Sequence, residues 1–349
     1  MVRSRSYIAT PPGATIKEQL QDRGMSQKEF AARMNVSEKH MSRLINGDVK
    51  LTPEMADKLE MVLGIPTEFW MNLEAIYQKK KIKAKKENAL EEDKQIAKKL
   101  PYREMSNLGW VPPTKESDEK VIILRKFFEV VELSRLEDTQ ITRIACRRLK
   151  ITEKSDLALM AWAQEAKIKA RSIETAPINI NALVKLIPAV RNMTRKKPEE
   201  FCKELKENLA KCGIALVFLP HLKGSFLQGA SFKNDNKIVV GLTVRGRDAD
   251  KFWFSFFHEL AHVVLRHIDK TGGTSDQEEK QADQWARDSL IPKDAFNLFK
   301  QQGNFTSVDV RQFAESLGLA PGIVVGRLQY EELIPYSQLN NLKEKYLIV

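Results

Sequence analysis

Cysteine and histidine are scarce in this chain, and long apolar runs are missing. Three cysteines occur, Cys146, Cys202 and Cys212, and no two of them form a CxxC pair. This odd, unpaired set excludes a disulfide framework and a cysteine-based zinc site, and it predicts reduced thiols in the cytoplasm. No run of about 18 apolar residues exists, so no segment is expected to span a membrane. The basic residues 1–6 are followed by no apolar core of signal-peptide length, which argues against export.

Positive charge is in excess. The chain has 57 lysine and arginine residues against 46 aspartate and glutamate residues, a formal net charge of +11. This balance permits nucleic-acid binding but does not establish it. Six lysines gather in one short segment: Lys79, Lys80, Lys81, Lys83, Lys85 and Lys86. They fit either the solvated surface of a linker or helix, or a phosphate-contacting extension of a DNA-binding domain.

The length of 349 residues is too great for one ordinary core and indicates two or three domains. Residues 1–78 show short helical segments with N-cap residues at their starts and glycines at their ends. Residues 79–177 are charged and helical in pattern, and prolines interrupt them. We interpret this middle region as a basic linker followed by a helical connecting region.

Residues 178–349 have a mixed pattern. Three short segments have strand character: residues 214–219, 225–232 and 237–242. A helix that is apolar on nearly all sides, residues 252–267, follows them, and then a second helix, residues 278–290. The predicted fold class is therefore mainly α, with an all-α N-terminal helix-turn-helix domain, a helical linker and an α+β C-terminal domain that contains a small β-sheet.

Two of the five histidines, His258 and His262, stand four residues apart in the sequence HELAH. On a helix this spacing places both side chains on one face, where two imidazole nitrogens can reach one Zn²⁺ ion. Glu259 lies between them and can take a proton from the attacking water and deliver it to the leaving amine. The apolar helix disfavours imidazolium, so neutral, ligating histidines are expected.

A third protein ligand is expected on the following helix. Glu279 and Asp283 share one face there, so Glu279 can bind the metal while Asp283 accepts a proton from the other nitrogen of a liganding histidine. Glu278 is the alternative ligand. The competing interpretation is a chance HExxH match on a core helix. The acidic helix at a suitable distance argues against chance.

The segment from Phe254 to Pro292 resembles the ImmA/IrrE family of zinc metallopeptidases, in which HExxH is followed by a helix that ends in leucine or isoleucine and then proline. Residues 282–286, ADQWA, are similar to part of that family's second motif, although Gln281 stands where many members have glutamate. The resemblance covers residues 178–346. It implies a zincin-like domain that cleaves a transcription regulator or a related protein, often under stress.

Residues 27–47 carry a second set of features. The small Ala31 lets two helices cross closely, Ser37 caps the second helix and Gly47 ends it. The segment resembles the Xre/Cro helix-turn-helix family, which implies that the second helix reads double-stranded operator DNA in the major groove. We predict DNA contacts by Gln27, Ser37, Glu38, Lys39, His40, Ser42, Arg43 and Asn46. Arg43 is the candidate guanine contact. The competing interpretation is a helical protein-interaction domain.

Residues 66–73 are similar to the HigA-type antitoxin branch, which implies homodimers on palindromic operators and, in some members, a cognate toxin. Two hypotheses follow. The first is a dimeric cytoplasmic repressor whose zinc endopeptidase domain cleaves a regulatory protein or itself, in a stress or toxin–antitoxin setting. The second is a non-enzymatic antitoxin or repressor whose zinc domain acts as a sensor or scaffold. The intact Glu259 favours the first, because a scaffold has no need of a general base.

Overall fold

The computed structural model describes residues 1–138, 145–146, 153–223, 225, 228–243, 248–269 and 274–346. The chain divides into two compact units, Met1–Gln95 and Ile96–Val349. No helix among the described residues is long and apolar enough to cross a bilayer.

The first unit is a cluster of short helices around one core. Its elements are α1 (Gly13–Asp22), α2 (Gln27–Arg33), α3 (Glu38–Asn46), α4 (Pro53–Leu63) and the start of α5 (Thr67–Lys99). Side-chain caps begin three of these helices, because the hydroxyls of Ser26, Ser37 and Thr52 accept backbone N–H groups. Phe30 and Met41, from α2 and α3, are fully buried in the core. The predicted helix-turn-helix is therefore present.

The first unit also holds a small feature that the all-α prediction lacks. Strands β1 (Val2–Arg3) and β2 (Ile8–Ala9) pair antiparallel. The turn between them is attached to α5, where Glu87 accepts hydrogen bonds from the Ser6 backbone N–H at 3.0 Å and from its hydroxyl at 2.7 Å. Helix α5 runs without interruption through the lysine-rich segment, so the predicted boundary at residue 78 falls inside a helix.

The second unit begins with α6 (Tyr102–Asn107), α7 (Ser117–Phe128), η1 (Leu133–Asp138) and α8 (Glu153–Arg171), and it is built on a four-stranded sheet. The strand order is β3 (Ala145–Cys146), β5 (Gly229–Asn234), β6 (Lys237–Thr243) and β4 (Ile214–Leu219). Strands β4 and β6 are parallel, and the other pairs are antiparallel.

The observed strands agree closely with the strands predicted from the sequence for two of the three segments. The prediction for residues 214–219 coincides with β4, and that for 237–242 is one residue short of β6. The segment predicted at 225–232 forms strand β5 only from Gly229, and its residues 226–227 lie outside the described part of the chain. Asp235, in the tight turn that joins β5 to β6, has a left-handed φ of 54°.

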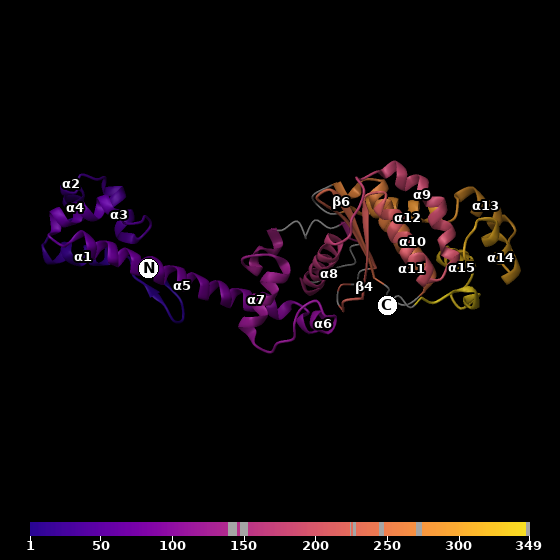
Figure 1. Ribbon diagram of the computed structural model, residues 1–349, viewed down its shortest axis with the longest axis horizontal. Coiled ribbons are helices and arrows are strands. Elements are labelled where there is room, and N and C mark those ends of the chain that lie inside the picture. The colour runs from indigo at the N-terminus through magenta and orange to yellow at the C-terminus, as the bar shows by residue number, and fades with distance from the viewer. Residues whose placement is uncertain are drawn as a thin grey trace. The chain divides into compact units, whose positions relative to one another are not determined.

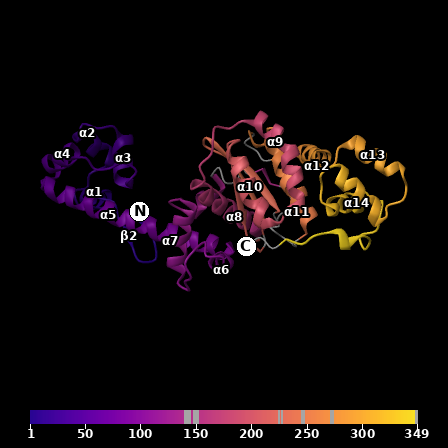
Figure 2. The ribbon, with the colours of Figure 1, turned by 45° about the vertical axis from the view of Figure 1, so that its right-hand side comes forward.

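Helices cover both faces of this sheet (Figures 1 and 2). Helix α8 packs on β4 and β6 from one side, where a Cβ on Gly241 would lie 2.5 Å from the Trp162 ring. Helices α9 (Ile180–Asn192), α10 (Pro198–Ala210) and α11 (Ala249–Val264) share the core on the other side. Because α8 packs on the sheet, the predicted boundary at residue 178 separates elements that belong to one fold. The charged composition of α8 led us to place this helix in the linker region.

The rest of the second unit follows α11. It consists of η4 (His267–Asp269), α12 (Asp276–Leu290), α13 (Lys293–Gln301), α14 (Ser307–Ser316), α15 (Pro321–Tyr330) and η5 (Asn340–Leu342). Helices α11 and α12 make extensive contact. In both views α13 and α14 lie beyond α12 on the side away from α8 (Figures 1 and 2). The Tyr346 hydroxyl accepts a hydrogen bond from Trp253 Nε1 at 2.9 Å, which ties the C-terminal segment to α11.

Candidate functional site

Helix α11 carries the HELAH sequence in the interior of the second unit. His258, Glu259 and His262 are 3%, 2% and 0% exposed. They are buried because α11 lies between the sheet and α12 and is apolar around most of its circumference. Polar side chains at this depth must find partners inside the protein. Their partners define the site.

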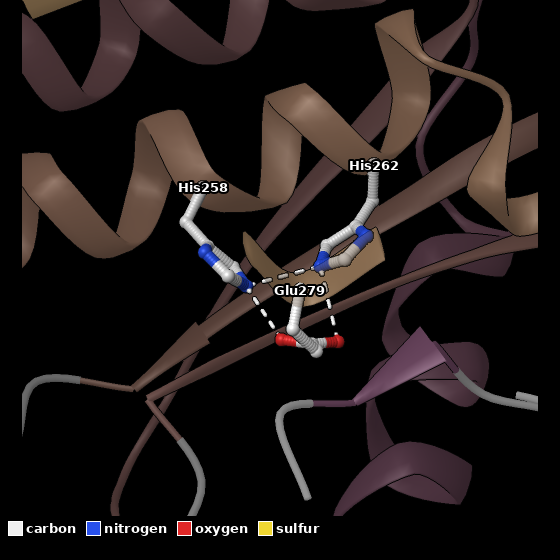
Figure 3. Close-up of side chains that lie close together, drawn as sticks. All are labelled: His258, His262 and Glu279. Carbon is white, nitrogen blue, oxygen red and sulfur yellow. Dashed lines mark hydrogen bonds and ion pairs between the residues drawn. The ribbon is translucent and has the colours of Figure 1, made fainter. Parts of the chain in front are cut away.

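His258 and His262 meet the Glu279 carboxylate from α12 (Figure 3). The two Nε2 atoms are 3.0 Å apart. Glu279 Oε2 lies 3.3 Å from His258 Nε2, and Oε1 lies 3.6 Å from His262 Nε2. One donor atom from each residue falls within 4.8 Å of the others. The three residues named from the sequence as metal ligands are thus brought together.

The donor set suits a metal ion. Two imidazole nitrogens and one carboxylate oxygen are the protein ligands of a common type of zinc hydrolase site, which keeps its fourth position open. Glu279 Oε2 is buried, and among the described residues it faces His258 Nε2 at 3.3 Å. A buried carboxylate is costly unless a cation compensates its charge, which protonated His258 does in the metal-free protein and a metal ion can do in its place. The site can therefore hold a metal through His258, His262 and Glu279.

A second layer of side chains orients both imidazoles. Asp283, one turn after Glu279, lies with Oδ1 2.9 Å from His258 Nδ1. His267 lies with Nδ1 3.0 Å from His262 Nδ1. These contacts leave both Nε2 atoms facing Glu279, and they fix the ring orientations. Asp283 thus lies next to the outer nitrogen of a candidate ligand histidine, where the sequence analysis placed it. His267 makes the corresponding contact with the other histidine, which the sequence did not indicate.

The position of His267 depends on where α11 ends. The sequence predicted one helix over residues 252–267, whereas α11 stops at Val264. Arg266 has a left-handed φ of 59°, which turns the chain so that η4 returns His267 toward His262. The predicted helix is therefore too long. No helical periodicity can reveal a contact made after such a turn.

Glu278 does not join the cluster. Its carboxylate accepts hydrogen bonds from the Ser275 backbone N–H at 2.8 Å and from the Ser275 hydroxyl at 2.9 Å. Ser275 in turn caps the start of α12 by accepting the Glu278 N–H. This reciprocal capping box occupies Glu278. Glu278, the alternative ligand considered from the sequence, therefore lies outside the cluster, and Glu279 is the member from α12.

Glu259 points toward strand β5. Its Oε2 accepts a hydrogen bond of 2.8 Å from the Ser231 hydroxyl, and both residues are buried. Gly229 lies beneath the same side chain, and a Cβ on it would lie 2.7 Å from Glu259 Cγ. Sequence patterns placed residues 229 and 231 on a strand but gave no sign that they contact Glu259. The strand, and not only the helix, positions this carboxylate.

The histidines have opposite pKa shifts in the metal-free protein. Burial lowers the pKa of His258, but hydrogen bonds to Asp283 and Glu279 and the charge of Glu259 outweigh it, so the pKa rises to about 9. Burial and the charge of nearby His258 lower the pKa of His262 to about 4. Without metal, the pair therefore carries one proton more than two neutral imidazoles near neutral pH, and this additional proton resides on His258.

Metal binding is expected to release this proton. A metal requires neutral His258, so the apparent affinity should rise by about tenfold per pH unit between about pH 7 and 9 and level off above the pKa of His258. Titrating the metal into the chain in buffers of different protonation enthalpy measures the release. Asp283→Asn replaces the charged acceptor of His258 Nδ1 with a neutral one and so weakens the hydrogen bond that raises this pKa, so the plateau should begin at lower pH. Affinity that is flat over this range would contradict the assignment.

In the first unit, the predicted DNA-contacting side chains lie on the solvent side of the helix-turn-helix. Glu38, Lys39 and Arg43 of α3 are exposed, whereas Met41 and Leu44 face the core. The other predicted contacts are also exposed or half-buried: Gln27, Ser37, His40, Ser42 and Asn46. Glu38 pairs loosely with Lys28 at 3.9 Å. The helix-turn-helix can thus present these groups to a groove, most of them from α3.

The N-terminus of α2 has one half of a capping box. The Ser26 hydroxyl accepts the Glu29 N–H at 3.1 Å. The Glu29 carboxylate, however, accepts a hydrogen bond from Arg33 at 2.7 Å. This i,i+4 pair turns Glu29 along the helix surface, away from the N-cap.

Comparisons with known proteins agree with both units. Residues 16–70 match the family described as Helix-turn-helix, and residues 156–320 match Peptidase U49. The uncharacterized HTH-type transcriptional regulator YddM of Escherichia coli strain K12 is 43% identical over 63 residues, which are 18% of this chain and 67% of YddM. The HTH-type regulator YbaQ of the same strain is 36% identical over 66 residues, 19% of this chain and 58% of YbaQ.

The fold and these matches define a protein with a DNA-binding helix-turn-helix and a metallopeptidase-type domain. The chain belongs to the Xre-type helix-turn-helix family of transcription regulators, and its C-terminal unit carries a Peptidase U49 domain of the ImmA/IrrE family. The Peptidase U49 match begins at residue 156, inside α8, in accord with the packing of that helix on the sheet.

Proposed function

We propose that this protein is a dimeric transcriptional repressor whose C-terminal domain is a zinc-dependent endopeptidase that cleaves a regulatory protein or itself. The observation that carries the proposal is the buried cluster of His258, His262 and Glu279, with Glu259 on the same helix as the two histidines. The attached helix-turn-helix favours a role in gene control over general protein breakdown. A stress response or a toxin–antitoxin pair is the proposed setting.

Different residues of the site would bind the metal, transfer the proton and orient the ligands during peptide hydrolysis. His258, His262 and Glu279 would hold Zn²⁺, which supplies Lewis-acid polarisation and a lowered pKa for the attacking water. Glu259 accepts the proton of that water and returns it to the leaving amine. Ser231 donates to Glu259 Oε2 and so orients this carboxylate. Asp283 and His267 keep the imidazoles oriented.

A direct experiment tests the peptidase. The purified full chain is incubated with Zn²⁺ or with a chelator, alone and with regulators encoded beside its gene, and new peptide termini are identified by mass spectrometry. Cleavage at one or a few bonds with zinc, and none with chelator, is expected. Bound zinc without any cleavage of these proteins would favour the alternative, a non-enzymatic antitoxin or repressor whose zinc domain is a sensor or scaffold.

Arg43 is proposed as a base-reading residue. Arg43→Ala should weaken binding to the preferred operator by about 1–3 kcal/mol and relax the preference at one base pair, because a bidentate contact to guanine is lost. Selection from randomised duplexes measures the preference. Arg33→Ala, which removes an exposed arginine from α2, is the matched control and should leave the preference unchanged. An Arg43→Ala protein with the same sequence preference would exclude Arg43 as a reader.

A further inference from the structure

A cavity of about 620 Å³ lies in the second unit, and its lining includes Phe254, one turn before His258. Its walls come from four parts of the fold: α11, the end of α12, α15 and the segment that follows α15. Phe254, Arg287, Tyr330 and Lys343 line it, one from each of these parts. The volume lies within the range of about 300–1,000 Å³ that is usual for ligand sites.

The cavity is one helical turn from His258 on α11, and on α12 it is two helical turns from Glu279. Phe254 precedes His258 by one turn, and the two ring centroids are 6.4 Å apart. Arg287 follows Asp283 by one turn on α12. A turn rises about 5.4 Å, which an extended peptide covers in about two residues. A peptide cleaved at the cluster would therefore reach Phe254 about two residues, and Arg287 about four residues, from the scissile bond.

The floor of the cavity is apolar and its rim is aromatic. Leu290, Ile291 and Ile323 line the floor and are 4%, 1% and 5% exposed. Tyr330 and Tyr336 stand at the rim with 58% and 68% of their surface exposed. Exposed aromatic side chains around an apolar hollow are typical of surfaces that bind other molecules. An apolar side chain fits the floor.

The charge around the cavity is positive. Five cationic side chains and two carboxylates line it: Lys251, Arg287, Arg327, Lys343 and Lys345, with Asp248 and Asp250. Both carboxylates are already neutralised, because Lys251 pairs with Asp248 at 2.7 Å and Lys343 pairs with Asp250 at 2.7 Å.

Two of the five cationic side chains, Arg287 and Lys345, have no carboxylate partner among the described residues. Among the described residues, Arg287 donates to the neutral Gln284 side chain at 3.0 Å and to the Tyr330 hydroxyl at 3.3 Å. Within the described residues, no carboxylate lies at ion-pair distance from Arg287 or Lys345. A ligand that supplies carboxylates would form ion pairs with Arg287 and Lys345.

We propose that this cavity binds a stretch of the protein substrate in which an apolar side chain is flanked by acidic residues. The apolar side chain occupies the floor formed by Leu290, Ile291 and Ile323, and the carboxylates meet Arg287 and Lys345. This inference rests on the proposed peptidase function, because it assigns the segment next to the scissile bond. It makes the cavity the element that selects the substrate.

The test measures peptide binding without turnover. The full chain carrying Glu259→Gln and loaded with zinc is titrated against three short fluorescent peptides: leucine among glutamates, leucine among lysines, and serine among glutamates. The leucine–glutamate peptide should bind about tenfold more tightly than each of the others, because it alone can both fill the apolar floor and form ion pairs with the cationic side chains. Equal binding of the three peptides would overturn the proposal, as would equal binding of the two acidic peptides.

Variants locate the binding at the cavity. Arg287→Glu should abolish the preference for the leucine–glutamate peptide, and Tyr330→Ala, at an exposed rim position, should reduce it. Lys185→Glu makes the same charge change at an exposed position on α9 outside the cavity and should have no effect. Circular dichroism checks that each variant is folded. An undiminished preference in folded Arg287→Glu and Tyr330→Ala proteins would place the binding elsewhere and overturn the proposal.

The outcome is separable from that of the proposed function. If the unmodified chain cleaves nothing while the Glu259→Gln chain still selects the acidic–apolar peptide through Arg287, the peptidase proposal fails and the binding site stands. If the unmodified chain cleaves a regulator without any acidic–apolar sequence near the scissile bond, the peptidase proposal stands and the assignment of the cavity fails.

Discussion

Replacing Glu259 with glutamine is expected to leave the metal bound while peptide cleavage falls by about 10²–10⁴-fold, the usual contribution of a positioned general base. Glutamine has nearly the same shape and can keep a hydrogen bond with Ser231, but it cannot accept a proton from water. The metal donors His258, His262 and Glu279 are untouched. Metal content by mass spectrometry and cleavage of an identified substrate measure the two effects separately.

Glu278→Gln is the matched control for this experiment. It makes the same chemical change one residue before Glu279, at a carboxylate that the capping box occupies. Glutamine also serves in capping boxes, so stability and cleavage should stay close to those of the unmodified chain. Substantial cleavage by a zinc-loaded Glu259→Gln protein would remove Glu259 from the role of general base.

Glu279→Ala should have the second large effect, a loss of metal affinity greater than that of any change around the site. Removing the carboxylate leaves two imidazoles and takes away the one anionic ligand. Asp283→Asn, which alters only the partner of His258 Nδ1, should weaken binding by about 10–100-fold. Glu279→Ala should therefore exceed about 100-fold. Competition against a chromophoric chelator measures both constants.

Asp276→Asn provides the control for this series, because Asp276 is an exposed carboxylate in the first turn of the same helix. Its metal affinity should equal that of the unmodified chain. The comparison with Glu278→Gln is equally informative. If Glu278→Gln lost the metal and Glu279→Ala kept it, the assignment of the third ligand would be reversed.

The parts of the site that follow helical spacing could be predicted from the sequence. His258 and His262 lie four residues apart, as do Glu279 and Asp283, and a regular helix fixes the direction of each pair. The choice between Glu278 and Glu279 required the structure, because adjacent residues differ by about 100° around a helix axis and only the packing of α12 on α11 decides which faces the metal.

The contacts that depend on irregular or long-range geometry could not be predicted. His267 approaches His262 only because Arg266 takes a left-handed conformation. Ser231 reaches Glu259 across 28 positions of sequence through the packing of β5 on α11. Likewise, α8 is rich in charge, and the packing of its buried side chains, among them Trp162, on the sheet is seen only in the structure. Sequence periodicity carries no information on such pairings.

The close approach of β5 to α11 also gives a criterion that can be applied to sequences alone. At position 229 any side chain would collide with Glu259 Cγ at 2.7 Å and with Leu242 Cδ2 at 3.0 Å. Glycine at this point of the strand is therefore a condition for the glutamate to adopt its present orientation. A related chain that keeps HExxH but has a larger residue here must move its glutamate or lose the use of it. A single strand position, far from the motif in sequence, thus indicates whether a chain with an intact motif can hold its glutamate in this orientation.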